Sequence, residues 1–292
     1  PSKNILPLMG SKEGIMHISL AFLNKGDTAL IPNPGYPTYA SATKMAEANV
    51  LQYELSPSTN WLPDFNKIEE NDLSQVKIMW INYPHMPTGA KAAAQDLEKI
   101  ASFGLKHDML ICNDNPYSFI LNNKYESLLN CNQFKSNILE LNSLSKSHNM
   151  AGWRIGMIAG EEHLINAILK VKSNMDSGMF YAIQKAAVKA LSLDENWFVE
   201  LNSNYEKRRA IAWEIYDELN LSYDKSAAGL FIWGKINSTI KNDLEFTDEL
   251  LLNYGVFITP GSIFGSNGKN YLRMSLCTKE STLKEILRRI KN

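Results

Sequence analysis

The sequence is poor in cysteine and has no long hydrophobic run, and each shortage excludes a class of protein. Its 292 residues include three cysteines, Cys112, Cys131 and Cys277, which are too scattered for a disulfide framework or for paired zinc ligands. No apolar run approaches the roughly 18 residues that span a bilayer, and no signal peptide is recognisable. We therefore expect a cytoplasmic protein with reduced thiols, no membrane segment and no metal site.

An excess of charge of one sign is also lacking. The chain has 30 basic and 31 acidic residues and a formal net charge of −1, so we expect neither nucleic acid nor an anionic membrane as a partner. The Gly-Lys pair Gly268-Lys269 has Ile263 and Asn270 where a Walker loop needs Gly and Ser or Thr. No GxGxxG follows a strand, which leaves a nicotinamide cofactor without support.

The sequence does contain short apolar runs that alternate with helical patterns. Runs typical of buried strands occupy 28–33, 49–55, 76–82, 108–114, 137–144 and 154–160, and helical patterns occupy 14–23, 39–48 and 92–107. Several of the strands are apolar on both faces, as expected for a sheet that helices cover on both sides. The alternation predicts an α/β protein with a mainly parallel sheet.

The pattern becomes helical after about residue 161. Helices are predicted at 161–174, 181–192 and 196–219, and the last is long enough to bridge two domains. A smaller α+β unit follows, with apolar runs at 229–236, 256–261 and 271–276 and helices at 243–255 and 281–292. We predict a large domain over 1–205 and a small C-terminal domain over 206–292.

Two charged residues follow predicted strands. Lys146 ends the stretch Ser-Leu-Ser-Lys, with Arg154 eight positions on. A lysine becomes a nucleophile when desolvation or nearby cations lower its pKa, and the alternative is an ordinary solvated lysine. Asp114 lies at the carboxyl end of its strand, where open α/β sheets bind ligands, and Tyr117 follows three residues later. The alternative for Asp114 is an aspartate that caps the next turn.

Two further features suggest anion binding. Gly10 and Ser11 lead into a helical run, where backbone N–H groups and a hydroxyl attract anions, although a plain helix cap would look the same. Arg273 lies inside the apolar run 271–276. A buried arginine needs an anionic partner, which is either a ligand or an acid of the small domain.

Taken in their order along the chain, these pieces resemble the class I and II aminotransferases, the fold-type I family that uses pyridoxal 5′-phosphate. The resemblance covers nearly the whole chain, and is strongest at SLSKSHNMAGWRIG (143–156), which matches the family's S-x-S-K motif followed by G-x-R. Among its members the aspartate and LL-diaminopimelate aminotransferases are the most similar. The resemblance implies a seven-stranded-type sheet sandwiched by helices and a homodimer with shared active sites.

The resemblance also implies roles for individual residues. Lys146 would hold the cofactor covalently and move a proton, Asp114 would pair with its pyridine nitrogen, and Tyr117 would bind its ring hydroxyl. Arg273 would bind the substrate α-carboxylate, and Lys12 the distal carboxylate of an acidic substrate. The implied cofactor-binding residues are Gly10, Ser11, Lys12, Tyr36, Asp114, Tyr117, Ser143, Lys146 and Arg154.

The chain departs from the family in two places. Met86 precedes Pro-Thr-Gly where the family has an asparagine that binds the ring oxygen, so Tyr117 would bind that oxygen alone or with His85. Family members also carry a segment before the Gly10 turn, which we expect to be omitted from this sequence. Ser177, in the stretch 173–180, is the expected contact to the neighbouring subunit's cofactor.

We therefore predict an aminotransferase that moves an amino group by a ping-pong mechanism. Lys12 favours an acidic or diacid donor such as aspartate, with 2-oxoglutarate as the acceptor. The alternative with the same cofactor is a carbon–sulfur β-lyase, and a distant alternative is the aminotransferase-like domain of a transcription regulator.

Overall fold

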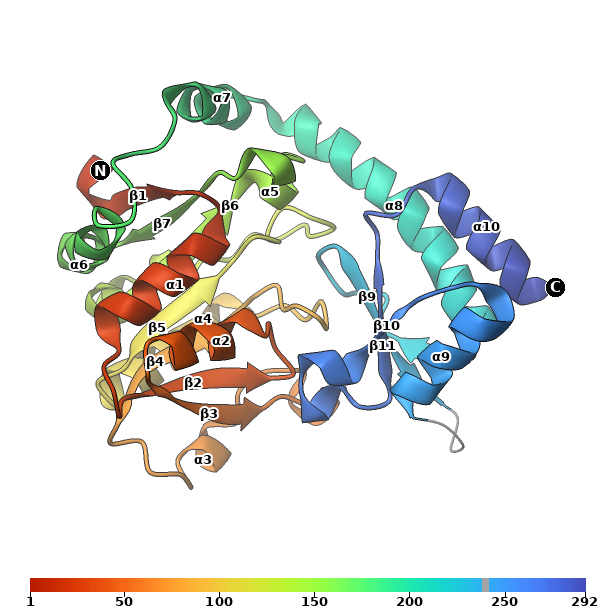
Figure 1. Ribbon diagram of the computed structural model, residues 1–292, viewed down its shortest axis with the longest axis horizontal. Coiled ribbons are helices and arrows are strands. Elements are labelled where there is room, and N and C mark those ends of the chain that lie inside the picture. Colours follow the sequence, from red (N-terminus) through yellow and green to blue (C-terminus); the bar gives the residue numbers. More distant parts are fainter. Residues whose placement is uncertain (238–241) are drawn as a thin grey trace.

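The computed structural model describes residues 1–237 and 242–292, in which a long helix runs from the side of a larger sheet to the outer side of a smaller one (Figure 1). The larger sheet has seven strands in the order β1-β7-β6-β5-β4-β2-β3. Strand β7 runs antiparallel to both of its neighbours, β1 and β6, and the remaining pairs of this sheet are parallel. The strands are β1 (Ile5–Leu8), β2 (Thr28–Asn33), β3 (Asn49–Glu54), β4 (Val76–Ile81), β5 (Leu110–Asp114), β6 (Ile138–Ser143) and β7 (Gly156–Gly160). The predicted α/β class and seven-stranded, mainly parallel sheet are confirmed.

Helices cover both faces of this sheet, which explains why residues 78–81 of β4 are all apolar. Along β4, Ile78 and Trp80 pack into one core with the helices α1 (Ser11–Phe22), α2 (Thr38–Met45) and α6 (Glu162–Lys172). Met79 and Ile81 pack into a second core with α3 (Phe65–Ile68) and α4 (Ala94–Lys106). Because successive residues of a strand point to opposite faces, a strand between two cores needs apolar residues at every position.

The smaller sheet is antiparallel, in the order β10-β11-β9-β8, with β8 (Leu221–Tyr223), β9 (Phe231–Ile236), β10 (Thr259–Pro260) and β11 (Tyr271–Ser275). The helices α8 (Glu195–Glu218), α9 (Asp243–Tyr254) and α10 (Glu280–Lys291) pack against it. The predicted domain boundary after residue 205 falls inside α8 and stays a prediction. None of the described helices is both long and apolar enough to cross a membrane.

Two short strands escaped the sequence analysis for physical reasons. β1 lies at the edge of the large sheet, paired only with β7, and contains Pro7, a residue that edge strands tolerate and that weakens a strand pattern. β8 spans three residues, too few to show an alternation. The short helix α5 (Leu144–Ser147) follows β6 directly, and α7 (Tyr181–Leu191) precedes α8. The carboxyl ends of the parallel strands face the smaller sheet (Figure 1).

Candidate active site

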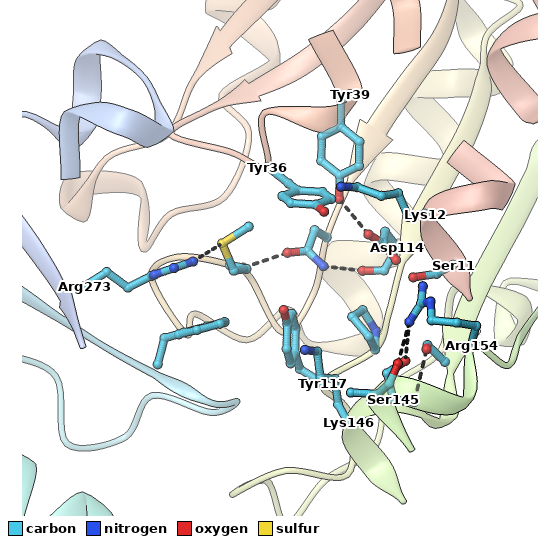
Figure 2. Close-up of a pocket in the computed structure, with 16 residues that line it drawn as sticks. Ser11, Lys12, Tyr36, Tyr39, Asp114, Tyr117, Ser145, Lys146, Arg154 and Arg273 are labelled. Carbon is cyan, nitrogen blue, oxygen red and sulfur yellow. Dashed lines mark hydrogen bonds between the residues drawn. The ribbon is translucent and has the colours of Figure 1, made fainter. Parts of the chain in front are cut away.

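A cavity of about 360 Å³ lies between the two sheets, and the predicted site residues gather around it. All of them except Gly10 line the cavity, from Ser11 at the start of α1 to Arg273 on β11. Figure 2 shows Arg273 approaching from the smaller sheet, opposite Asp114 and Arg154. Asp114 ends β5, and Lys146 follows β6 on α5. Because the two strands are parallel, both residues lie at the carboxyl end of the sheet.

Asp114 is buried and leaves one carboxylate oxygen free. The Tyr39 hydroxyl donates to its Oδ2 at 3.2 Å, while its Oδ1 is buried and has no hydrogen-bond partner among the residues that the structure describes. The Asn82 amide donates to the backbone carbonyl of Asp114 and fixes the residue from behind. Burial raises the pKa of the carboxyl group to about 6, although the hydrogen bond from Tyr39 acts to lower it. The free oxygen is an acceptor prepared for an N–H group.

Arg154 lies on the same side of the cavity as Asp114, opposite Arg273 (Figure 2). Its Nη1 donates to the Ser145 hydroxyl at 3.3 Å and to the Ala151 carbonyl at 2.9 Å, and its Nη2 donates to the Met9 carbonyl at 3.4 Å. Gly10 has a φ of 84°, and a Cβ added there would overlap this guanidinium, so the close approach requires glycine. Arg154, Ser11 and Ser145 thus gather donors on one side of the cavity, where an anion can bind.

Ser143 and Ser145 have different positions. The Ser143 hydroxyl donates to the Ile155 carbonyl at 3.3 Å and accepts the Ser145 amide, which makes it a cap for α5. Ser145 is the serine that contacts Arg154, although the sequence analysis named only Ser143 for the phosphate. Both line the cavity.

Arg273 is held at the other end by aromatic rings. Its guanidinium lies 4.2 Å from the centroid of Phe231 and 4.5 Å from that of Phe264, and its Nη1 donates to Met86 Sδ at 3.3 Å. No acid among the described residues forms an ion pair with it, so the alternative of a salt bridge within the small domain has no partner there. Its Nε is buried and unpartnered, and burial lowers its pKa. The side chain is prepared for a carboxylate.

Lys12 and Tyr36 lie beside each other, with Lys12 Nζ 5.8 Å from the centroid of the Tyr36 ring. Tyr117 lines the cavity between the two sheets, and burial together with the nearby Asp114 raises its pKa, which keeps the hydroxyl protonated as a donor. Lys12 is exposed, and the described residues give it no acid partner. All three line the cavity, and their roles stay predictions.

His85 does not take the place of the missing asparagine. Its Nδ1 lies 2.8 Å from the Thr88 hydroxyl, and it is buried away from the cavity, whereas Met86 lines the cavity. Burial lowers the pKa of His85 to about 3, so the ring is neutral. Ser177 is exposed and does not line the cavity of its own chain.

Three residues of the site were not found from the sequence: Tyr39, Asn82 and Ser145. Tyr39 packs flat on Trp80, with ring centroids 5.0 Å apart, which aims its hydroxyl at Asp114. The Asn82 side chain joins the Asp114 carbonyl to the Met86 amide, to which it is bonded at 2.7 Å. The second tyrosine of the stretch Tyr-Pro-Thr-Tyr was the only available signal for Tyr39.

The arrangement fits pyridoxal 5′-phosphate. The buried, unpartnered Asp114 Oδ1 is the acceptor that a protonated pyridine nitrogen needs. Ser11, Ser145 and Arg154 supply donors for a phosphate dianion, and the space left by Gly10 keeps the guanidinium in place. Lys146 lines the same cavity, where its amino group can attach to an aldehyde (Figure 2).

Comparisons with known proteins agree with this chemistry. The family model described as aminotransferase class I and II matches residues 1–290. An LL-diaminopimelate aminotransferase of Dehalococcoides mccartyi is 40% identical over 100% of this chain and 76% of its own length. One from Aquifex aeolicus is 37% identical, with the same coverage. The chain thus spans about three quarters of the length of these relatives.

Solved structures match the whole fold. The substrate-bound BacF structure from Bacillus subtilis has a TM-score of 0.95 and 36% identity, and covers 100% of this chain and 75% of its own. A probable N-succinyldiaminopimelate aminotransferase from Thermus thermophilus has a TM-score of 0.91 and 30% identity, covering 99% of this chain and 77% of its own.

Proposed function

The chain belongs to the class I and II aminotransferase family, and on that premise we propose that its amino donor carries a second carboxylate and that its acceptor is a 2-oxo acid such as 2-oxoglutarate. The protein is an aminotransferase that depends on pyridoxal 5′-phosphate. The donor class rests on one observation: Arg273 and Lys12 both line the cavity, and neither has an acid partner among the described residues.

Each residue then has a defined task. Arg273 binds the α-carboxylate, because a bidentate arginine–carboxylate pair is stronger than the thioether contact that it replaces. Lys12 faces the far end of the substrate. With the cofactor bound, Lys146 would take the proton from the substrate Cα and later give it up again, and the Asp114 carboxylate would accept the N–H of the ring nitrogen. Bound pyridoxal phosphate supplies the electron sink for this proton transfer.

The relatives favour one donor within this class. Several curated relatives are named LL-diaminopimelate aminotransferases, at 34 to 40% identity. LL-Diaminopimelate has a carboxylate at each end, as the two unpaired cations require. We therefore place it ahead of aspartate, the donor that the sequence first suggested, and none of these relatives is named as a β-lyase.

The test is an absorbance titration of the holoenzyme with single amino acids. LL-Diaminopimelate, L-aspartate and L-glutamate are compared with L-alanine and L-phenylalanine at equal concentration. We expect the dicarboxylic donors to convert the cofactor to its amino form, and 2-oxoglutarate to restore the first spectrum. A response to alanine or phenylalanine alone would contradict the donor class. Pyruvate and ammonia released from a cysteine conjugate would identify the β-lyase instead.

We also propose a homodimer in which the segment 173–180 meets the partner's site. Large apolar side chains are exposed along this segment and α7: Phe180 is 71%, Tyr181 66% and Leu191 66% accessible. A surface of this kind typically marks a protein interface. Light scattering on the purified protein should give twice the chain mass, and Leu191→Glu should shift it toward the monomer. A monomeric parent would contradict the proposal.

For its location we propose the cytoplasm. All three cysteines are free, two of them buried, and a reducing compartment would keep them so. Cell fractionation with an antibody to the chain tests this.

A further inference from the structure

A group of buried charges lies behind the turn that carries Gly10 and Ser11. Glu13, in the first turn of α1, accepts the Met9 N–H at 2.5 Å through Oε2. Its Oε1 accepts His17 Nε2 and Lys172 Nζ, each at 3.0 Å. Its side chain is 13% exposed, that of His17 4% and that of Lys172 6%. None of these residues lines the cavity or has a role in the proposed reaction.

The network continues into the segment that follows α6. Lys172 Nζ also donates to Asp176 Oδ2, and Asp176 Oδ1 accepts the Gly178 N–H at 2.9 Å. Lys172 therefore joins two carboxylates that belong to different parts of the chain. Burial by itself would lower the lysine pKa, but the bonds to Asp176 and Glu13 outweigh it and leave the pKa raised. The lysine stays charged, and it compensates both acids.

The network acts on the cofactor turn through Met9, whose backbone is held on both sides. Its N–H is bound by Glu13 and its carbonyl by Arg154, the arginine of the anion-binding wall. Gly10 and Ser11 follow directly, so the position of the turn against Arg154 depends on both bonds. If Lys172 were lost, Glu13 would be left as a poorly compensated charge next to a turn that binds a dianion.

We propose that Glu13 and Lys172 are positioning residues for the phosphate end of the cofactor. Together they hold the turn 9–11 against Arg154 and tie it to the turn 176–178. The inference concerns the phosphate alone, so it is independent of which donor the enzyme uses.

The experiment compares two probes on the full chain freed of cofactor: pyridoxal 5′-phosphate and pyridoxal, which lacks the phosphate. Lys172→Met keeps the length of the side chain and removes its charge. We expect it to raise the dissociation constant of pyridoxal 5′-phosphate about 10-fold, and that of pyridoxal less than about 2-fold. Glu13→Gln keeps one acceptor for the Met9 N–H but loses the charge. We expect it to raise the dissociation constant of pyridoxal 5′-phosphate about 3-fold.

Lys170→Met is the matched control, because Lys170 is exposed on the same helix two residues away. It should leave both dissociation constants unchanged. Two results would overturn the proposal and leave a purely structural network. One is an equal rise of both dissociation constants in Lys172→Met, and the other is a lower Tm with both dissociation constants unchanged. If Lys172→Met fails to fold, the ratio of the two affinities in Glu13→Gln decides by the same criterion.

Discussion

The two ends of the cavity are built by different forces. At the cofactor end, hydrogen bonds fix both charged residues. Asp114 accepts one from Tyr39, and Arg154 donates to Ser145 and to the Met9 carbonyl. At the proposed substrate end, Arg273 lies between two aromatic faces, and among the described residues its polar contact is a thioether. A group that holds a resident cofactor can be locked in advance, whereas a group that meets an exchanging substrate must keep its charge free. The cation–π contacts offset part of the cost of that free charge.

The largest effect should come from Lys146, which belongs to the cofactor end. Lys146→Ala removes both the covalent attachment and the proton carrier, so turnover should fall by about 10⁴-fold. Mass spectrometry after borohydride reduction should find no cofactor joined to the variant, whereas the exposed control Lys99→Ala should carry it. A variant of Lys146 that still acquires the reduced cofactor would place the attachment elsewhere.

Arg273 tests the substrate end. Removing the guanidinium in Arg273→Ala takes two charge-assisted hydrogen bonds from the substrate carboxylate, so KM for the donor should rise by about 10³-fold. The affinity for pyridoxal 5′-phosphate should stay within about 2-fold, because the cofactor end is built separately. Arg288→Ala, on the exposed face of α10, is the control. An unchanged KM would make Arg273 a structural residue.

The buried carboxyl group of Asp114 should make the stability of the cofactor-free protein depend on pH. Burial lifts its pKa from an ordinary 3.8 to about 6, so the folded chain binds this proton more tightly than the unfolded chain does. The stabilisation is fully present below pH about 4, and it is lost as the pH rises through about 6. At pH 8, Asp114→Asn should therefore stabilise the cofactor-free protein by at most about 3 kcal/mol.

Urea unfolding of the cofactor-free parent and of Asp114→Asn, at pH 4 and at pH 8, measures this difference. The gain should vanish at pH 4. A gain of the same size at both values would mean that the carboxyl group is not the source.

The smallest effect should come from Met86. Met86→Leu keeps the volume and removes the sulfur, and since a thioether is a weak acceptor, KM for the donor should change by less than about 3-fold. Steady-state kinetics with the best donor will show it. A change above 10-fold would mean that the sulfur, and not the aromatic pair, fixes Arg273.

The same contrast separates what the sequence could predict from what it could not. Lys146, Asp114 and Arg154 could be proposed from the sequence because they lie in short motifs, which follow β6, end β5 and precede β7. The contact of Arg273 with Met86 joins residues 187 positions apart, and that of Lys172 with Glu13 joins residues 159 apart. No local pattern encodes either contact. Tyr39 likewise reaches Asp114 only because Trp80, on another strand, orients its ring.

The pairing of β1 with β7 has a consequence for how the chain folds. Ile5 pairs with Ala159, so the strand that leads into the Gly10 turn can pair only after β7, far along the chain, is in place. Contacts this distant close slowly, because a long loop must first be ordered. The turn that we propose to bind the phosphate is therefore among the late features to assemble, and cofactor binding would report on a finished sheet during refolding.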